Sequence, residues 1–181
     1  MTERLLLTPP EIVDTQDHLI FLAGPIQGAP DWQSTAAEII HDLDSSIVVA
    51  SPRKEYEEGS FVYERQVDWE THFLRKAGKA GVVAFWLANQ TIETPGRSYA
   101  QTTRFELAEW KMRHEYEGAK LAVGIEEGFG NERYIRRRLT QDTPGIPISN
   151  SLEQLMADAV ELLGYRRLCA RFIIVSTRRR S

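Results

Sequence analysis

Short runs dominated by apolar residues recur along the chain, and each is closed by a glycine, a proline or a polar segment. Four such runs lie at residues 18–24, 46–50, 81–87 and 120–125, and residues 143–148 contain a shorter fifth candidate. A run that is apolar at successive positions, and not only at alternate ones, is typical of a strand buried on both faces of a parallel sheet. The pattern therefore predicts a sheet that is covered on both sides.

The segments between these runs repeat their apolar residues with the period of an α-helix. They predict helices at residues 32–43, 63–77, about 103–116, 132–139 and 152–163. Strands that alternate with helices indicate an α/β fold with a mainly parallel sheet, right-handed crossovers and helices on both faces. Among the possible strand orders, a flavodoxin-like order is the one we expect.

The chain divides into three parts by this pattern. Residues 1–17 are predicted to be an N-terminal arm, because Pro9 and Pro10 interrupt regular structure. Residues 18–164 form a single α/β domain, and residues 165–181 form a basic tail in which six arginines flank an apolar core. The tail is open to three interpretations, which are an edge strand, an oligomer contact and a disordered end. A nucleic-acid arm is less favoured, because runs of charge are usually solvated.

Composition narrows the class of protein. With 181 residues and a formal net charge of −4, the chain has room for a core and no general attraction to nucleic acid or anionic membranes. Its apolar runs are too short to span a bilayer, and its first residues do not resemble a signal peptide. The single cysteine, Cys169, excludes an internal disulfide and fits the cytoplasm. The histidines show no metal-ligand spacing, so we expect no metal site.

The most informative acidic residue is Glu106, which follows a polar loop at the start of a predicted helix. An ionised carboxylate in this position could attack the anomeric carbon of a sugar and form a covalent glycosyl-enzyme. The partial positive charge at the amino end of the helix would favour the ionised form. In α/β folds, the first helical turn after a strand is also where ligands bind.

The same residues support a purely structural interpretation. Thr103 and Glu106 have the spacing of a capping box, in which the glutamate accepts a hydrogen bond from the backbone N–H of the cap residue. Spacing alone favours the cap over the catalytic role.

Four segments in sequence order resemble the nucleoside 2-deoxyribosyltransferase family, and in particular its divergent bacterial branch. They are Ile20–Ile26, Gln66–Glu70, Val82–Trp86 and Thr102–Ala108, and the resemblance extends over about residues 18 to 140. It implies a flavodoxin-like subunit, a homo-oligomer with active sites near the subunit interfaces, and no cofactor or metal. It also implies that the partners are nucleosides and free nucleobases. Such enzymes cleave the N-glycosidic bond and pass the sugar to another base, or to water in hydrolase relatives.

The resemblance also implies roles for individual residues. Glu106 corresponds to the family nucleophile, and Glu70, with Asp68 as second choice, corresponds to the acid that holds and protonates the base. The loop from Gly24 to Asp31 would line the sugar pocket. The residues predicted to bind substrate are therefore Phe21, Gly24, Pro25, Asp68, Thr103 and Asn131, the last from the loop at residues 128–134.

The chain departs from the family pattern at several positions. Phe21 stands where many members carry a tyrosine, so the tyrosine hydroxyl is missing there, and Tyr63 or Tyr99 could supply one instead. Residues 97–100 lack the aspartate that precedes the nucleophile in better-studied members, and Ala108 stands where glycine is common.

Two other functions stay open at this point. One is an N-glycoside hydrolase acting on nucleosides or their 5′-monophosphates, for which a phosphate site would be built from basic residues such as Arg53, Lys54, Arg97 and Arg104. The other is a non-catalytic nucleotide-binding module, which the Phe21 departure favours.

Overall fold

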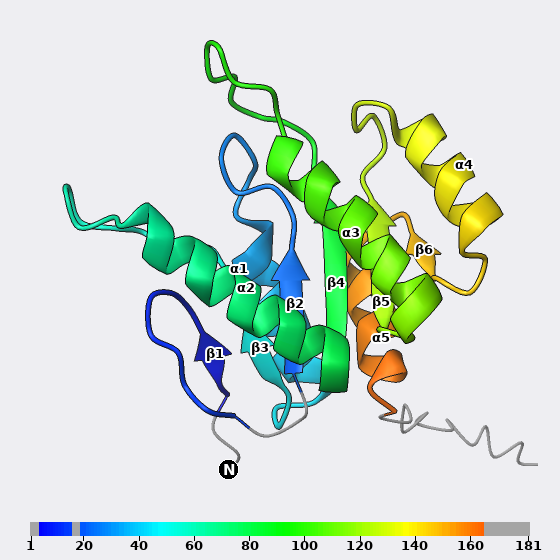
Figure 1. The fold of residues 1–181 in the computed structure, drawn as a ribbon, viewed down its shortest axis with the longest axis horizontal. Helices are drawn as coiled ribbons and strands as arrows, with labels where there is room; N and C mark the ends of the chain where they lie inside the picture. The colour runs from blue at the N-terminus through cyan, green and yellow to red at the C-terminus, as the bar shows by residue number, and fades with distance from the viewer. Residues whose placement is uncertain (1–3, 16–18, 165–181) are drawn as a thin grey trace, which may run out of the picture.

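The computed structural model describes residues 4–15 and 19–164, and Figure 1 shows their arrangement. The strands are β1 (Leu6–Leu7), β2 (Leu19–Ala23), β3 (Val48–Ala50), β4 (Val82–Leu87), β5 (Leu121–Ile125) and β6 (Ile148–Ser149). The helices are α1 (Trp32–Leu43), α2 (Tyr63–Ala80), α3 (Gln101–Glu117), α4 (Glu132–Asp142) and α5 (Leu152–Leu162). The basic tail and its three interpretations lie outside the described residues.

The strands form one six-stranded parallel sheet in the order β1-β3-β2-β4-β5-β6. The order β3-β2-β4-β5-β6 is that of a flavodoxin-like sheet, so the predicted fold class is confirmed. The chain passes from β2 outward to β3 and then crosses back to β4 on the other side of β2. The loops after β2 and β4 therefore diverge, which leaves a crevice at the carboxyl ends of these strands.

Two layers of helices cover the sheet, with α1 and α5 on one face and α2 and α3 on the other (Figure 1). Alternate residues of β2 belong to the two sides: Ile20 packs in the cluster with α1 and α5, whereas Phe21 packs in the cluster with α2 and α3. The central strands are buried at every position, as the apolar runs predict. Among the described helices, none is both long and apolar enough to cross a membrane.

The predicted N-terminal arm contains an edge strand. Leu6 and Leu7 pair in parallel with Val49 and Ala50, so residues 6–7 extend the sheet beyond β3. Two backbone hydrogen bonds join the two strands, from Val49 N to Leu5 O and from Ser51 N to Leu7 O. The prolines did not prevent the strand, because they follow it and leave the N–H groups of the pairing residues intact.

Gly81 joins α2 to β4 at a point where the chain touches the start of β2. A Cβ atom at this position would lie 2.1 Å from the backbone oxygen of Leu19. The clashing atom belongs to the backbone of a buried strand, so neither Gly81 nor Leu19 can shift without disturbing the sheet. The glycine therefore lets β2 and β4 lie side by side beneath the crevice.

We predict that Gly81→Ala lowers the free energy of unfolding by about 1–3 kcal/mol, the usual cost of overpacking a core. Urea denaturation of the purified protein measures it. Gly145→Ala is the matched control, since a Cβ there meets nothing within 4 Å. Equal stability of the two variants would contradict the close-approach argument.

Candidate active site

A cavity of about 860 Å³ opens at the carboxyl ends of the strands, at the crevice between β2 and β4. Its walls come from the end of β2, the loops after β2, β3 and β4, and the amino-terminal parts of α2 and α3. This is where the fold places ligands in other proteins of its kind. Six of the eight residues predicted from the sequence line it, namely Phe21, Gly24, Pro25, Glu70, Thr103 and Glu106.

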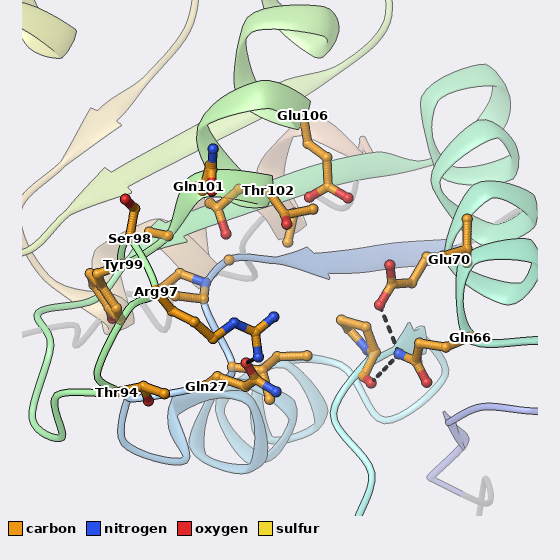
Figure 2. Close-up of a pocket in the computed structure, with 18 of the residues that line it drawn as sticks. Gln27, Gln66, Glu70, Thr94, Arg97, Ser98, Tyr99, Gln101, Thr102 and Glu106 are labelled. Carbon is orange, nitrogen blue, oxygen red and sulfur yellow. Dashed lines mark hydrogen bonds between the residues drawn. The ribbon is translucent and has the colours of Figure 1, made fainter. Parts of the chain in front are cut away.

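Glu106 lies in the second turn of α3, not in the first. Ala100 adopts a left-handed backbone conformation with φ 54°, and the helix begins immediately after it at Gln101. No side chain caps this end of the helix, so the capping-box interpretation of Thr103 and Glu106 is wrong. Thr103 is buried, and Glu106 instead points into the cavity (Figure 2).

Glu70 approaches the same space from the neighbouring helix α2. Figure 2 shows the side chains of Glu70 and Glu106 pointing into the cavity from these two neighbouring helices, α2 and α3. One oxygen, Oε1, accepts a hydrogen bond from Gln66 Nε2 at 2.7 Å. Gln66 precedes Glu70 by one helical turn, which puts both side chains on one face of α2.

Both carboxyls resist ionisation. Burial raises the pKa of Glu106 to about 7, and the charges of Glu70 and then Glu109 add to the shift. Burial also raises the pKa of Glu70, although the hydrogen bond from Gln66 opposes this shift. The expectation that the start of the helix keeps Glu106 readily ionised is therefore wrong, because burial and neighbouring carboxylates raise its pKa.

The loop after β2 is held close to the sheet. A Cβ atom on Gly24 would lie 2.4 Å from the backbone oxygen of Trp86 and 2.6 Å from the Trp32 ring. The indole Nε1 of Trp32 donates to the backbone oxygen of Pro25 at 2.9 Å. These contacts fix the first residues of the loop, and Pro25 forms part of the cavity wall.

Arg53 braces the same loop from outside the cavity. Its Nη2 donates to the backbone oxygens of Ile26, Ala29 and Pro30 at 3.1, 3.2 and 3.0 Å. Its Nε donates to Gln33, and it forms an ion pair with Asp31 at 3.4 Å. Arg53 is thus a structural residue, which removes it from the predicted phosphate-binding set.

The long loop before α3 forms the other wall. Thr91 N donates to the backbone oxygen of Gly28 at 2.7 Å, which joins this loop to the loop after β2. Arg97 lies in the cavity wall and donates to the side chain of Gln27 (Figure 2). Arg104 instead donates to Gly130 O at 2.8 Å and lies over the Phe129 ring.

Neither tyrosine suggested as a replacement at Phe21 is a clear substitute. The hydroxyl of Tyr99 donates to Ala88 O at 2.7 Å, and burial, followed by the charge of Glu126, raises its pKa to about 12. Tyr63 lines the cavity but is largely exposed. Tyr56, which sequence reasoning missed, has its hydroxyl bonded to Gln66 at 2.6 Å.

Two predicted residues lie outside this cavity. Asp68 is exposed on α2, two positions before Glu70 and therefore on a different side of the helix. Asn131 is exposed at the start of α4, with φ 62°, and its side chain makes no capping hydrogen bond. Within residues 4–15 and 19–164, no three metal-ligating side chains gather at a common point.

Comparison with known proteins agrees with the fold and the cavity. The family described as nucleoside 2-deoxyribosyltransferase like matches residues 17–129, which is more than half of the chain. No curated protein matches the sequence. The chain belongs to the nucleoside 2-deoxyribosyltransferase-like family, so the resemblance seen in its sequence is confirmed. That membership makes it a relative of nucleoside-processing enzymes.

The raised pKa of Glu106 predicts a pH dependence of stability. A carboxyl with a pKa of about 7 in the folded chain and an ordinary value of 4.5 when unfolded binds more protons in the folded state between these values. The free energy of unfolding contributed by this group therefore falls as pH rises through that window. Glu106→Gln removes this loss, so the variant should gain stability relative to wild type as the pH is raised.

Urea denaturation at a series of pH values across this window measures the difference. Glu115→Gln, an exposed change on the same helix, is the control. A Glu106→Gln difference that stays constant across the series would show that Glu106 titrates normally.

Proposed function

We propose that this protein is a nucleoside 2-deoxyribosyltransferase that works through a covalent intermediate on Glu106. The observation that carries the proposal is the pair of carboxyls, Glu106 and Glu70, that point into one cavity from the neighbouring helices α3 and α2. Membership of the family supports the substrate class, which is nucleosides and free nucleobases. The chemistry needs one carboxylate and one carboxylic acid, and no cofactor.

In the first half-reaction, a carboxylate oxygen of Glu106 attacks C1′ of the deoxyribose and forms an ester bond. The electron pair of the C1′–N bond passes to the base, and Glu70 donates its proton to a ring nitrogen, so the base departs neutral. Glu106 is then an ester and Glu70 a carboxylate.

In the second half-reaction, an N–H of the incoming base gives its proton to the Glu70 carboxylate, and the ring nitrogen attacks C1′. The ester bond breaks, and its electron pair returns to Glu106. Both carboxyls regain their starting forms, because the proton that left with the first base is replaced by one from the second.

The raised pKa values of both carboxyls support a pair that holds one proton, and the larger rise is at Glu106. Two carboxylates that face one buried space resist double ionisation, so the pair tends to hold one proton. Turnover requires that proton on Glu70 when Glu106 attacks. A bound base whose ring nitrogen accepts from Glu70 favours this arrangement.

Asp68 and Asn131 have no role within one subunit in this proposal. Both are exposed, which leaves them accessible to a neighbouring subunit of the homo-oligomer that the family resemblance implies. The cytoplasm is the compartment that we propose for the reaction, because it contains nucleosides and free bases.

The first test follows deoxyinosine by chromatography, with and without adenine. We expect deoxyadenosine only in the presence of adenine. Glu106→Gln should lower the rate by at least about 10³-fold, the scale of losing a covalent nucleophile. Mass spectrometry should find one deoxyribosyl group on the peptide that carries Glu106.

Glu115→Gln serves again as the control, because it removes an exposed carboxylate from the same helix. Free hypoxanthine in both tubes, without deoxyadenosine, would identify a hydrolase in place of a transferase. Saturable binding without bond cleavage would identify a non-catalytic nucleotide-binding module.

One observation favours a second candidate, an N-glycoside hydrolase for nucleoside 5′-monophosphates. Of the basic residues predicted to bind phosphate, Arg97 and Lys54 line the cavity, whereas Arg53 and Arg104 are bonded elsewhere. Figure 2 shows Arg97 entering the cavity from the loop before α3, on a different side from Glu70. A nucleotide with its base beside Glu70 could extend its phosphate toward this guanidinium.

For this candidate, Arg97→Gln should raise KM for deoxyinosine monophosphate by about 10-fold or more, the loss of one charge-assisted contact, and leave deoxyinosine unaffected. Initial rates on both substrates measure the difference. Arg75→Gln, an exposed change on α2 outside the cavity, is the control. Equal KM changes on both substrates would leave Arg97 without a phosphate role.

A further inference from the structure

Gln66 donates a hydrogen bond to Glu70 from the side away from Glu106 (Figure 2), and both polar atoms of its amide hold hydrogen bonds. Its Nε2 donates to Pro52 O at 2.9 Å and to Glu70 Oε1 at 2.7 Å, and its Oε1 accepts from the Tyr56 hydroxyl at 2.6 Å. The orientation of the amide follows from its partners. A backbone carbonyl can only accept, so the nitrogen must face Pro52.

This arrangement distinguishes the two oxygens of Glu70. Oε1 accepts the amide N–H, which favours it as the carbonyl oxygen of the neutral carboxyl, because a carbonyl oxygen is a stronger acceptor than a hydroxyl oxygen. The same bond therefore favours the proton on Oε2. Figure 2 shows that the second oxygen of Glu70 points into the cavity, away from Gln66.

The contacts also connect Glu70 to a segment without regular structure. Tyr56 lies in the loop between β3 and α2, where its ring meets Phe61 edge-on at 5.2 Å and Lys54 lies 5.8 Å from its centre. Gln66 joins this loop to α2 through Tyr56 and Pro52. The orientation of Glu70 therefore depends on the loop as well as on its own helix.

We propose that Gln66, held by Tyr56 and Pro52, is a positioning residue that fixes Glu70 so that its proton-bearing oxygen faces the departing base. The proposal rests on the proposed function, in which Glu70 gives that proton to a ring nitrogen as the C1′–N electron pair passes to the base. Gln66 acts only through Glu70, and Tyr56 acts only through Gln66.

Gln66→Leu tests the proposal, because leucine keeps a similar volume and a good helix propensity but donates no hydrogen bond. We expect kcat/KM for deoxyinosine to fall about 10- to 100-fold, the effect of a misplaced catalytic group, and mainly through kcat. Tyr56→Phe should cause a smaller loss, since it leaves the bond between Gln66 and Glu70 in place. Gln154→Leu is the matched control, because it removes a similar glutamine–carboxylate bond, to Asp158 on α5, far from the cavity.

A second substrate separates positioning from general damage to the fold. The base of 7-methyl-2′-deoxyguanosine is already cationic and departs without receiving a proton, so Gln66→Leu should cleave it at nearly the wild-type rate. An equal loss on both substrates would overturn the positioning role. Unchanged rates on both substrates would overturn it as well.

A third measurement does not depend on turnover. Loss of a hydrogen bond to the charged form should raise the pKa of Glu70 in Gln66→Leu, and NMR titration of protein labelled with ¹³C-glutamate measures it. An unchanged titration would show that Gln66 does not act on this carboxyl. If wild type cleaves neither substrate, the proposed function fails and this proposal fails with it. An active wild type with an unaffected variant disproves only the role of Gln66.

Discussion

One steric constraint sets how closely the loop after β2 lies against the sheet beside the crevice, and it is the contact of Gly24 with the end of β4. There is no room for a Cβ atom between Gly24, the Trp86 carbonyl and the Trp32 ring, so β2 ends directly against its neighbour. The following loop must turn outward, where Trp32 and Arg53 hold it by their hydrogen bonds to backbone oxygens. The space that remains between this loop and the one after β4 is the cavity. Everything proposed for the site depends on that separation of two loops at the switch point.

Within this cavity the protein tolerates an arrangement that an ordinary core would avoid. Glu106 and Glu70 point into one space where burial raises the pKa of both. Arg97 and Lys54 line the same cavity, and neither forms an ion pair with these carboxyls. Unfavourable burial of two acids in a cleft is a mark of functional sites, because it provides groups that exchange protons near neutral pH. The bond from Gln66 then makes the two oxygens of Glu70 inequivalent.

Local sequence patterns were least reliable where they concerned the start of α3. Thr103 and Glu106 have capping-box spacing, yet the helix already begins at Gln101. Ala100, the residue before it, has a left-handed backbone conformation, which is not helical. Alanine rarely adopts that conformation, and the residues next to Ala100 give no sequence signal that predicts it. The same limit applies to residues 6–7, whose two leucines were too short a run to predict a strand. Their pairing with β3 depends on an edge that only the assembled sheet provides.

The sequence by itself determined the parallel α/β architecture, because continuous apolar runs and helical periods are local consequences of burial on both faces of a sheet. With the family resemblance, it also selected Glu106, Glu70, Phe21, Gly24, Pro25 and Thr103 as residues of one site. Only the tertiary structure decided which of them share a cavity and which candidates, such as Asp68 and Asn131, lie outside it. It also revealed Gln66 and Tyr56, and it assigned Arg53 to the loop. Those contacts join residues distant in the chain, and their distances are set by packing, which no local pattern records.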